Sequence, residues 1–217
     1  AMLWLFGLWA CPGAGADSRV VRKSQAPQGF WDHWGDGQAE IAGYRLTQPR
    51  YGELRQGTAV LVFVTETFTH HQRVKSDGGH GDEYPVIKLN EMRDFPTGIY
   101  DYHAMTSSFV PLDGRYPWGV PSKVSLTVQE WCGHVYEHVV FEPETFRGVS
   151  HSYFDGEADR VYVGDLPEGA VSMDAWPILV RGLAGHDPGA GQSEAVALLP
   201  RLLTHRFEHK TSPAWIK

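Results

Sequence analysis

The sequence predicts a mainly β protein: a long-stranded, curved antiparallel sheet, shaped as a half-barrel, with one or two short helices near the C-terminus. Most of the 217-residue chain consists of segments in which apolar residues either alternate with polar ones or occupy both faces, a pattern typical of strands. Clusters of Gly, Pro and Asp separate these segments as turns. Helical periodicity appears only late and briefly. A closed barrel or a sandwich is the competing architecture.

The strand prediction is clearest in residues 123–130, where Val124, Leu126 and Val128 point to one face and polar residues to the other. In residues 58–68 both faces are apolar, so the sheet is expected to be covered on both sides there. The same reasoning predicts further strands at residues 37–46, 84–92, 98–110, 135–141 and 146–154.

The late segments predict helices followed by a return to strand. Residues 174–183 begin with a capping Asp, carry a Pro in the first turn and end at glycines, which predicts a helix. Residues 193–199 offer a second cap and one or two helical turns before a proline. Residues 203–207 alternate again. Because the chain ends soon afterwards, at Lys217, we expect a partner strand to be missing and the C-terminus to be incomplete.

The N-terminus has the pattern of an export signal. Residues 3–10 are apolar and uncharged, end at Cys11 and are followed by small residues. The run is shorter than the roughly 20 apolar residues that cross a bilayer. Either it ends in a lipobox, with Cys11 lipidated, or it is cleaved after Ala16. Residues 1–16 are thus expected to be a signal peptide and residues 17–217 a single domain, in a bacterial periplasm or on a membrane. An N-terminal strand or a partner-binding segment is the alternative interpretation of the apolar run.

The composition of the chain excludes some classes of partner and of structure. The chain is 42% hydrophobic and 12% aromatic, with a formal net charge of -7, which argues against nucleic acid or an anionic lipid surface as a partner. Its two cysteines are Cys11 and Cys132, so no disulfide framework is expected once Cys11 is lipidated or removed. We therefore expect Cys132 to be a buried small hydrophobe.

The sequence contains no motif that specifies catalysis or cofactor binding. A phosphate loop, a nucleophile elbow and a dinucleotide fingerprint are all missing, so no cofactor is predicted. Cys132 and His134 lie two residues apart and share a face of an extended backbone, which allows the imidazole to activate the thiol. No third group that would orient His134 is identifiable. Structural packing around Trp131 is the competing interpretation.

The histidines and acidic clusters do not predict a metal site. On a strand, His134 and His138 lie about 13 Å apart, too far to share an ion. The His- and Asp-rich residues 70–83 are interpreted as a solvated loop. Residues 155–159 carry three alternating carboxylates but lack the glycine and the distal Glu of a calcium loop, so they predict a polar turn.

Tryptophans are the candidate ligand-binding residues. Exposed Trp side chains on a β scaffold stack on sugars or line an apolar cleft, and core filling is the competing role. The candidates are Trp31, Trp34, Trp118 and Trp131. Trp31 and Trp34 lie among polar residues before the first strand, where they would cap one end of a groove.

Three segments carry a family resemblance, residues 30–40, 94–102 and 129–134. With them, the chain resembles a family of uncharacterised bacterial exported proteins, many of which have lipoprotein signals. This resemblance implies no known activity or catalytic residue. More remotely, the order of the predicted elements is similar to that of periplasmic half-barrel proteins of the lipoprotein-carrier type.

Together these observations predict a non-enzymatic protein of the bacterial cell envelope whose curved sheet binds an apolar ligand, such as a lipid or an acyl chain. Acylation of Cys11 would anchor it to a membrane. Two alternatives remain. One is a thiol-dependent hydrolase that uses Cys132 and His134. The other is a carbohydrate-binding module that uses exposed tryptophans.

Overall fold

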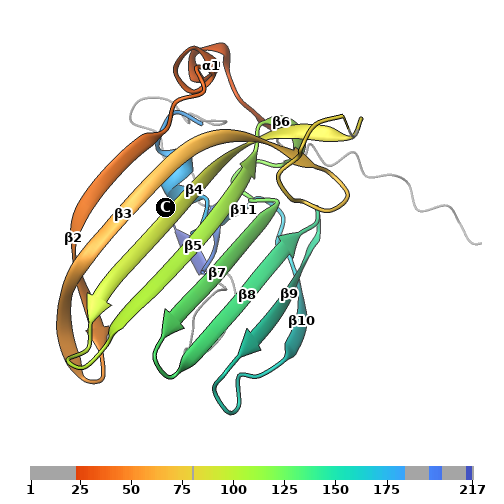
Figure 1. The fold of residues 1–217 in the computed structure, drawn as a ribbon. Coiled ribbons are helices and arrows are strands. Elements are labelled where there is room, and N and C mark those ends of the chain that lie inside the picture. Colours follow the sequence, from red (N-terminus) through yellow and green to blue (C-terminus); the bar gives the residue numbers. More distant parts are fainter. Residues whose placement is uncertain (1–22, 80, 184–195, 202–213, 217) are drawn as a thin grey trace, which may run out of the picture.

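The structure, a computed structural model, describes residues 23–79, 81–183, 196–201 and 214–216. Its main feature is an eight-stranded antiparallel sheet in the order β10-β9-β8-β7-β5-β4-β3-β2, which is open at both edges in the part described (Figure 1). The strands are β2 (Glu40–Arg50), β3 (Glu53–Thr69), β4 (Glu83–Pro96), β5 (Asp101–Pro111), β7 (Lys123–Glu130), β8 (Gly133–Phe141), β9 (Thr145–Ser152) and β10 (Arg160–Asp165).

This sheet confirms the predicted fold class. Strand β7 has the predicted bounds, and each of the other six predicted segments overlaps one strand. β10 was not predicted, because its consecutive residues Val161, Tyr162 and Val163 are all apolar or aromatic and show no alternation with polar residues.

One face of the sheet, here called the covered face, is packed against the chain that follows β10. That chain forms β11 (Ala170–Ser172), α2 (Trp176–Leu179), β12 (Val196–Leu199) and β13 (Ala214–Ile216), which lie behind the sheet in Figure 1. Buried residues of β7, β8 and β9 contact Leu166, Ala170, Ala197 and Leu199. Burial of a Val, Leu or Phe side chain in this core stabilises the fold by roughly 1.5–3 kcal/mol.

The second predicted helix, residues 193–199, is wrong over residues 196–199, the part that the structure describes. Residues 196–199 form strand β12, which pairs with β11 and β13. Ala197 and Leu199 are buried in the core, so pairing and alternating burial outweigh helix propensity. The first predicted helix exists but is shorter, as the four-residue α2. Residues 1–16, with Cys11, and residues 203–207 lie outside the described residues.

A further helix, α1 (Gln28–Trp34), precedes the sheet. Phe30 and Trp34, four residues apart, face the same way and are buried, with Trp34 6.3 Å from the Phe63 ring. Among the described residues, no helix is both long and apolar enough to span a membrane.

The opposite face is here called the open face, and the described residues cover it only at its upper end in Figure 1. There β6 (Asp113–Pro117) pairs with β1 (Lys23–Gln25), and Phe68, Tyr84, Phe109 and Tyr116 form a cluster. The expected double coverage of residues 58–68 is therefore found at Phe68, whereas Val60 and Val64 are half-buried on the open face.

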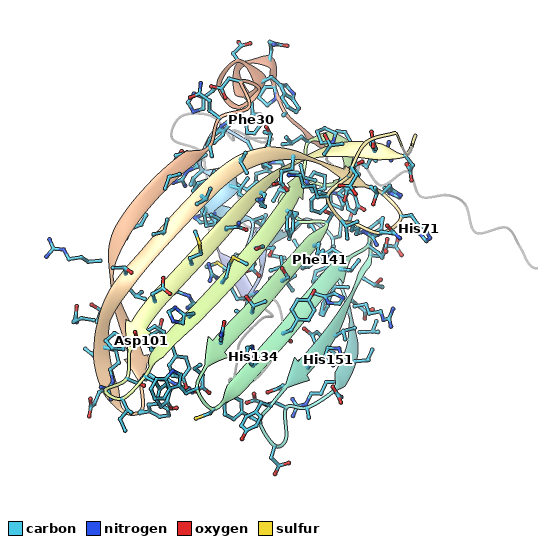
Figure 2. All side chains as sticks on the ribbon, viewed as in Figure 1. Phe30, His71, Asp101, His134, Phe141 and His151 are labelled. Atoms are coloured by element: carbon cyan, nitrogen blue, oxygen red, sulfur yellow. The ribbon has the colours of Figure 1, made fainter. Side chains whose placement is uncertain are left out.

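The lower end carries four hairpin turns and is here called the hairpin end. These turns join β2 to β3, β4 to β5, β7 to β8 and β9 to β10. Figure 2 shows Asp101, His134 and His151 toward this end, far from Phe30 and His71. The open face is accessible here.

Candidate functional site

A groove of about 460 Å³ lies on the open face near the hairpin end. A second hollow of about 250 Å³ adjoins it, because His103 and Gln129 line both. We treat the two together as one site, the open-face groove. No Lys or Arg is among the described residues that line it.

Strand register builds the floor of the groove. Directly paired residues of antiparallel strands point to the same face, so each set of partners forms a row across the sheet. One row is polar and consists of Asp94, His103, Gln129 and His134. The next row is mixed and consists of Met92, Met105, Thr127 and Tyr136. The floor thus offers hydrogen-bonding groups beside a flexible apolar surface.

Two side chains in these rows, His103 and Tyr136, are set up to form hydrogen bonds. The carboxylate of Asp94 lies 2.5 Å from Nδ1 of His103, which orients the imidazole and leaves Nε2 for a ligand. Burial raises the pKa of Tyr136, so its hydroxyl stays protonated at neutral pH. Both groups are therefore poised to form hydrogen bonds.

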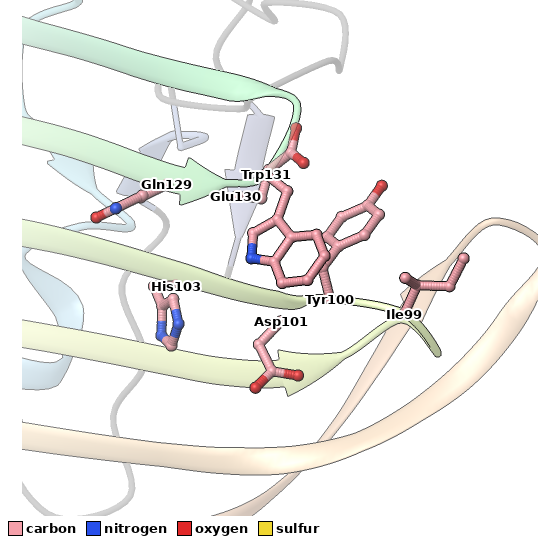
Figure 3. A pocket seen from close by; sticks show the side chains of 7 residues that line it. All are labelled: Ile99, Tyr100, Asp101, His103, Gln129, Glu130 and Trp131. Atoms are coloured by element: carbon pink, nitrogen blue, oxygen red, sulfur yellow. The ribbon is translucent and has the colours of Figure 1, made fainter.

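An exposed aromatic pair forms one wall of the groove. Trp131, in the β7–β8 turn, is 78% exposed and stacks on Tyr100, with ring centroids 6.0 Å apart and planes inclined by 21° (Figure 3). One face of the indole is against Tyr100, and most of the remaining indole surface is exposed and accessible to a ligand. Such exposure of the largest apolar side chain is typical of a binding surface.

A hydrogen-bond network holds this wall in place. The Tyr51 hydroxyl lies 3.2 Å from that of Tyr100 and 2.8 Å from that of Tyr102, and Arg50 donates to Tyr102 at 2.7 Å. Hydrogen bonds with Tyr100 and Tyr102 keep the pKa of Tyr51 below its usual value. Tyr102 stacks on the buried Phe95, so the wall is anchored to the core.

The structure does not bring Cys132 and His134 together. Cys132 is exposed rather than buried as predicted, and its Sγ lies 3.7 Å from the Tyr100 hydroxyl. His134 lies in the floor of the groove, and no hydrogen bond joins it to Cys132 within the described chain. The prediction assumed extended backbone, but residues 131–132 form a turn.

Of the four candidate tryptophans, only Trp131 lines the groove. Trp34 is only 4% exposed, Trp31 packs partly buried beside it, and the Trp118 indole donates to the Leu183 carbonyl oxygen at 3.1 Å. These three belong to one core cluster at the other end of the sheet. The expectation that Trp34 caps a groove fails because the buried side of α1 packs against the sheet.

Sequence reasoning missed most groove residues. Tyr100, His103, Gln129 and Tyr136 come from three strands and a turn, and no short motif links them. The polar faces of β7 and β8 were a usable signal, because Gln129 and His134 lie on them. Their partnership with His103 required the strand register.

Metal binding receives no support from the residues that can be examined. No group of three or more His, Cys, Asp or Glu side chains in the described ranges is placed to hold an ion. Residues 155–159 form the predicted turn, and His151 Nδ1 lies 2.7 Å from Asp159 Oδ1.

Comparison of the chain with protein-family models, curated proteins and solved structures finds no match in any of the three. The resemblance to exported proteins described above therefore stays a prediction.

Proposed function

We propose that the protein is a non-enzymatic binding protein that holds a saccharide in the open-face groove. The observation that carries this proposal is the free indole face of Trp131 beside the polar row that contains His103 and Gln129. A sugar ring presents an apolar C–H face and an edge of hydroxyls. An aromatic plane next to hydrogen-bonding side chains complements both.

The polar groups suit neutral hydroxyls better than ions. A hydroxyl both donates and accepts, and so does the Gln129 amide, while the His103 and His134 rings offer further hydrogen-bonding nitrogens. The carboxylate of Asp94 is already paired with His103. Among the described lining residues, no Lys or Arg offers a counter-charge for an anionic ligand.

An apolar ligand such as a lipid or an acyl chain is the second candidate, because Met92 and Met105 line the floor of the groove. The covered face offers less support for it. The middle of that face carries Glu91 and Arg93 on β4, and Glu91 pairs with Arg201 at 2.7 Å. A hydrocarbon chain there would have to displace charged groups.

A binding experiment with the purified chain separates these ligand classes. We expect hits on a glycan array, and tryptophan fluorescence titrations with those glycans should show Trp131→Ala weakening binding about tenfold, as the loss of one stacked ring predicts. Trp176→Ala is the matched control, because Trp176 is also exposed but belongs to α2, behind the sheet. Unchanged affinity of Trp131→Ala would contradict the proposal. Binding of a fluorescent fatty acid with an empty glycan array would favour the lipid alternative.

A further inference from the structure

We infer that the saccharide carries an acidic group and that Lys123, His138 and Arg147 hold this group next to the groove, on the side away from the hairpin end. This inference rests on the proposed function. The three residues, here called the basic cluster, lie on the open face of β7, β8 and β9. None of them lines the groove itself, so the acidic group lies beyond the part of the ligand that the groove holds.

Strand register brings the basic cluster together. Lys123 and Arg147 are the register partners of Val140, one on each side of β8. His138 lies two residues before Val140 on the same face, at a position diagonal to both basic side chains. Diagonal neighbours in an antiparallel sheet are about 7–8 Å apart, a distance that Lys and Arg side chains are long enough to bridge. The three side chains can therefore converge on one ligand group.

The positive charge of the basic cluster has no carboxylate partner within the described parts of the chain. Arg147 is exposed and forms no ion pair there, although Asp165 lies diagonal to it on β10. Lys123 donates to a backbone carbonyl oxygen at 3.4 Å. By contrast Lys88, which lies in the same row of the sheet as Lys123, is paired with Glu66. An anion at the basic cluster would therefore meet charges that the described residues leave unneutralised.

The state of His138 reflects the same positive field. Its Nδ1 is buried and has no hydrogen-bond partner among the described residues. Burial lowers the pKa of His138, and the charges of Lys123 on β7 and of Arg147 and His151 on β9 lower it further. An anion beside His138 would offset these charges and accept a hydrogen bond from the imidazole.

The basic cluster is continuous with the groove. Tyr136 lines the groove, and the centroid of its ring is 5.5 Å from that of His138. Figure 2 labels His134 and Phe141, between which this part of β8 lies. From His134 to His138 the strand rises about 13 Å, which is longer than one sugar ring. A ligand that contacts both Trp131 and the basic cluster is therefore an oligosaccharide, with an acidic unit at His138.

The test compares acidic oligosaccharides with uncharged ligands of the same length. Galacturonate, mannuronate and hyaluronan tetrasaccharides and their methyl esters are titrated by calorimetry into the full chain. In at least one series we expect the acid to bind about tenfold more tightly than its ester, as a charge-assisted contact predicts. This preference should shrink as the salt concentration rises, because salt screens exposed charges.

Single substitutions assign the preference to the basic cluster. Arg147→Gln and Lys123→Gln should each lower the affinity for the acid toward that for the ester and leave the affinity for the ester unchanged. Arg160→Gln is the matched control, because Arg160 is exposed on β10 but points to the covered face. It removes the same charge and should keep the preference. Thermal melts check that each variant is folded.

The outcomes distinguish the two proposals. Equal affinity for acid and ester, in a chain that binds glycans through Trp131, would overturn the acidic subsite and leave the proposed function standing. A preference that survives in both Arg147→Gln and Lys123→Gln, or binding of inorganic phosphate as tight as that of the acids, would overturn it as well. Failure of all three series together with an empty glycan array would overturn the proposed function and this inference with it.

Discussion

At the scale of single residues, the most unusual group is Asp174. It is 3% exposed, and burial raises the pKa of its carboxyl to about 6, with Glu91 adding to the effect and Arg201, 3.4 Å away, opposing it. The folded protein therefore binds the proton of Asp174 more tightly than an unfolded chain, in which the pKa is near 3.8. The resulting stabilisation is complete below that lower value and is lost as the pH rises through about 6.

Asp174→Asn tests this linkage. Removal of a buried charge should raise the free energy of unfolding at pH 7 by about 1–3 kcal/mol, and the gain should shrink toward zero near pH 4. Urea denaturation at pH 4, 5.5 and 7 measures it. Asp32→Asn, at an exposed position of α1, should change stability little at any of these values. A loss of stability at pH 7 would mean instead that the Asp174–Arg201 ion pair outweighs the cost of burial.

At the scale of elements, the long strands depend on small residues where neighbouring strands approach closely. A Cβ at Gly57 in β3 would lie 2.2 Å from the Asp94 carbonyl oxygen and 2.7 Å from Phe95 Cβ. The absence of a side chain at Gly57 therefore lets β3 bend over β4, the strand that carries Asp94 to the groove.

Gly57→Ala is expected to destabilise the protein by about 2 kcal/mol, because overpacking against a backbone atom cannot be relieved by a side-chain movement. Gly43→Ala is the matched control. Gly43 lies in β2, and a Cβ there would meet no atom within 4 Å. That variant should be neutral or slightly stabilised. Equal midpoints for the two variants in thermal melts would refute the close-approach argument.

Short elements were the least predictable. β7 alternates strictly, and its bounds follow from one local pattern. β12 has only four residues and is defined by two partner strands, β11 and β13, from distant parts of the chain. The sequence around β12 does not indicate which strands it pairs with. The helix predicted for these residues was therefore wrong.

At the scale of the whole molecule, the two ends of the sheet differ in character. The upper end is closed by β6, α1 and a polar loop, whereas the hairpin end exposes Leu54, Ile99, Trp131 and Tyr153 at its turns. This asymmetry places the proposed ligand site at the opposite end of the sheet from β6 and its partner strand β1.

The export prediction also belongs to this scale. Expression in a bacterial host, followed by mass spectrometry of the mature N-terminus, should show either a diacylated Cys11 or a chain that begins at Asp17. The first outcome would anchor the protein to a membrane and the second would release it from one. Retention of residues 1–16 would contradict both and favour the strand or partner-binding interpretation.

The local pattern of the sequence was sufficient for the β class and the antiparallel sheet of long strands, because alternation and turn chemistry act between near neighbours. It named Trp131 only as one of four candidate tryptophans. Strand register and turn conformation decided the rest. They placed Trp131 on Tyr100, aligned His103 with Gln129 and His134, turned Cys132 outward and put Trp34 in the core. These arrangements join residues from separate strands, and no local pattern encodes the distance between them.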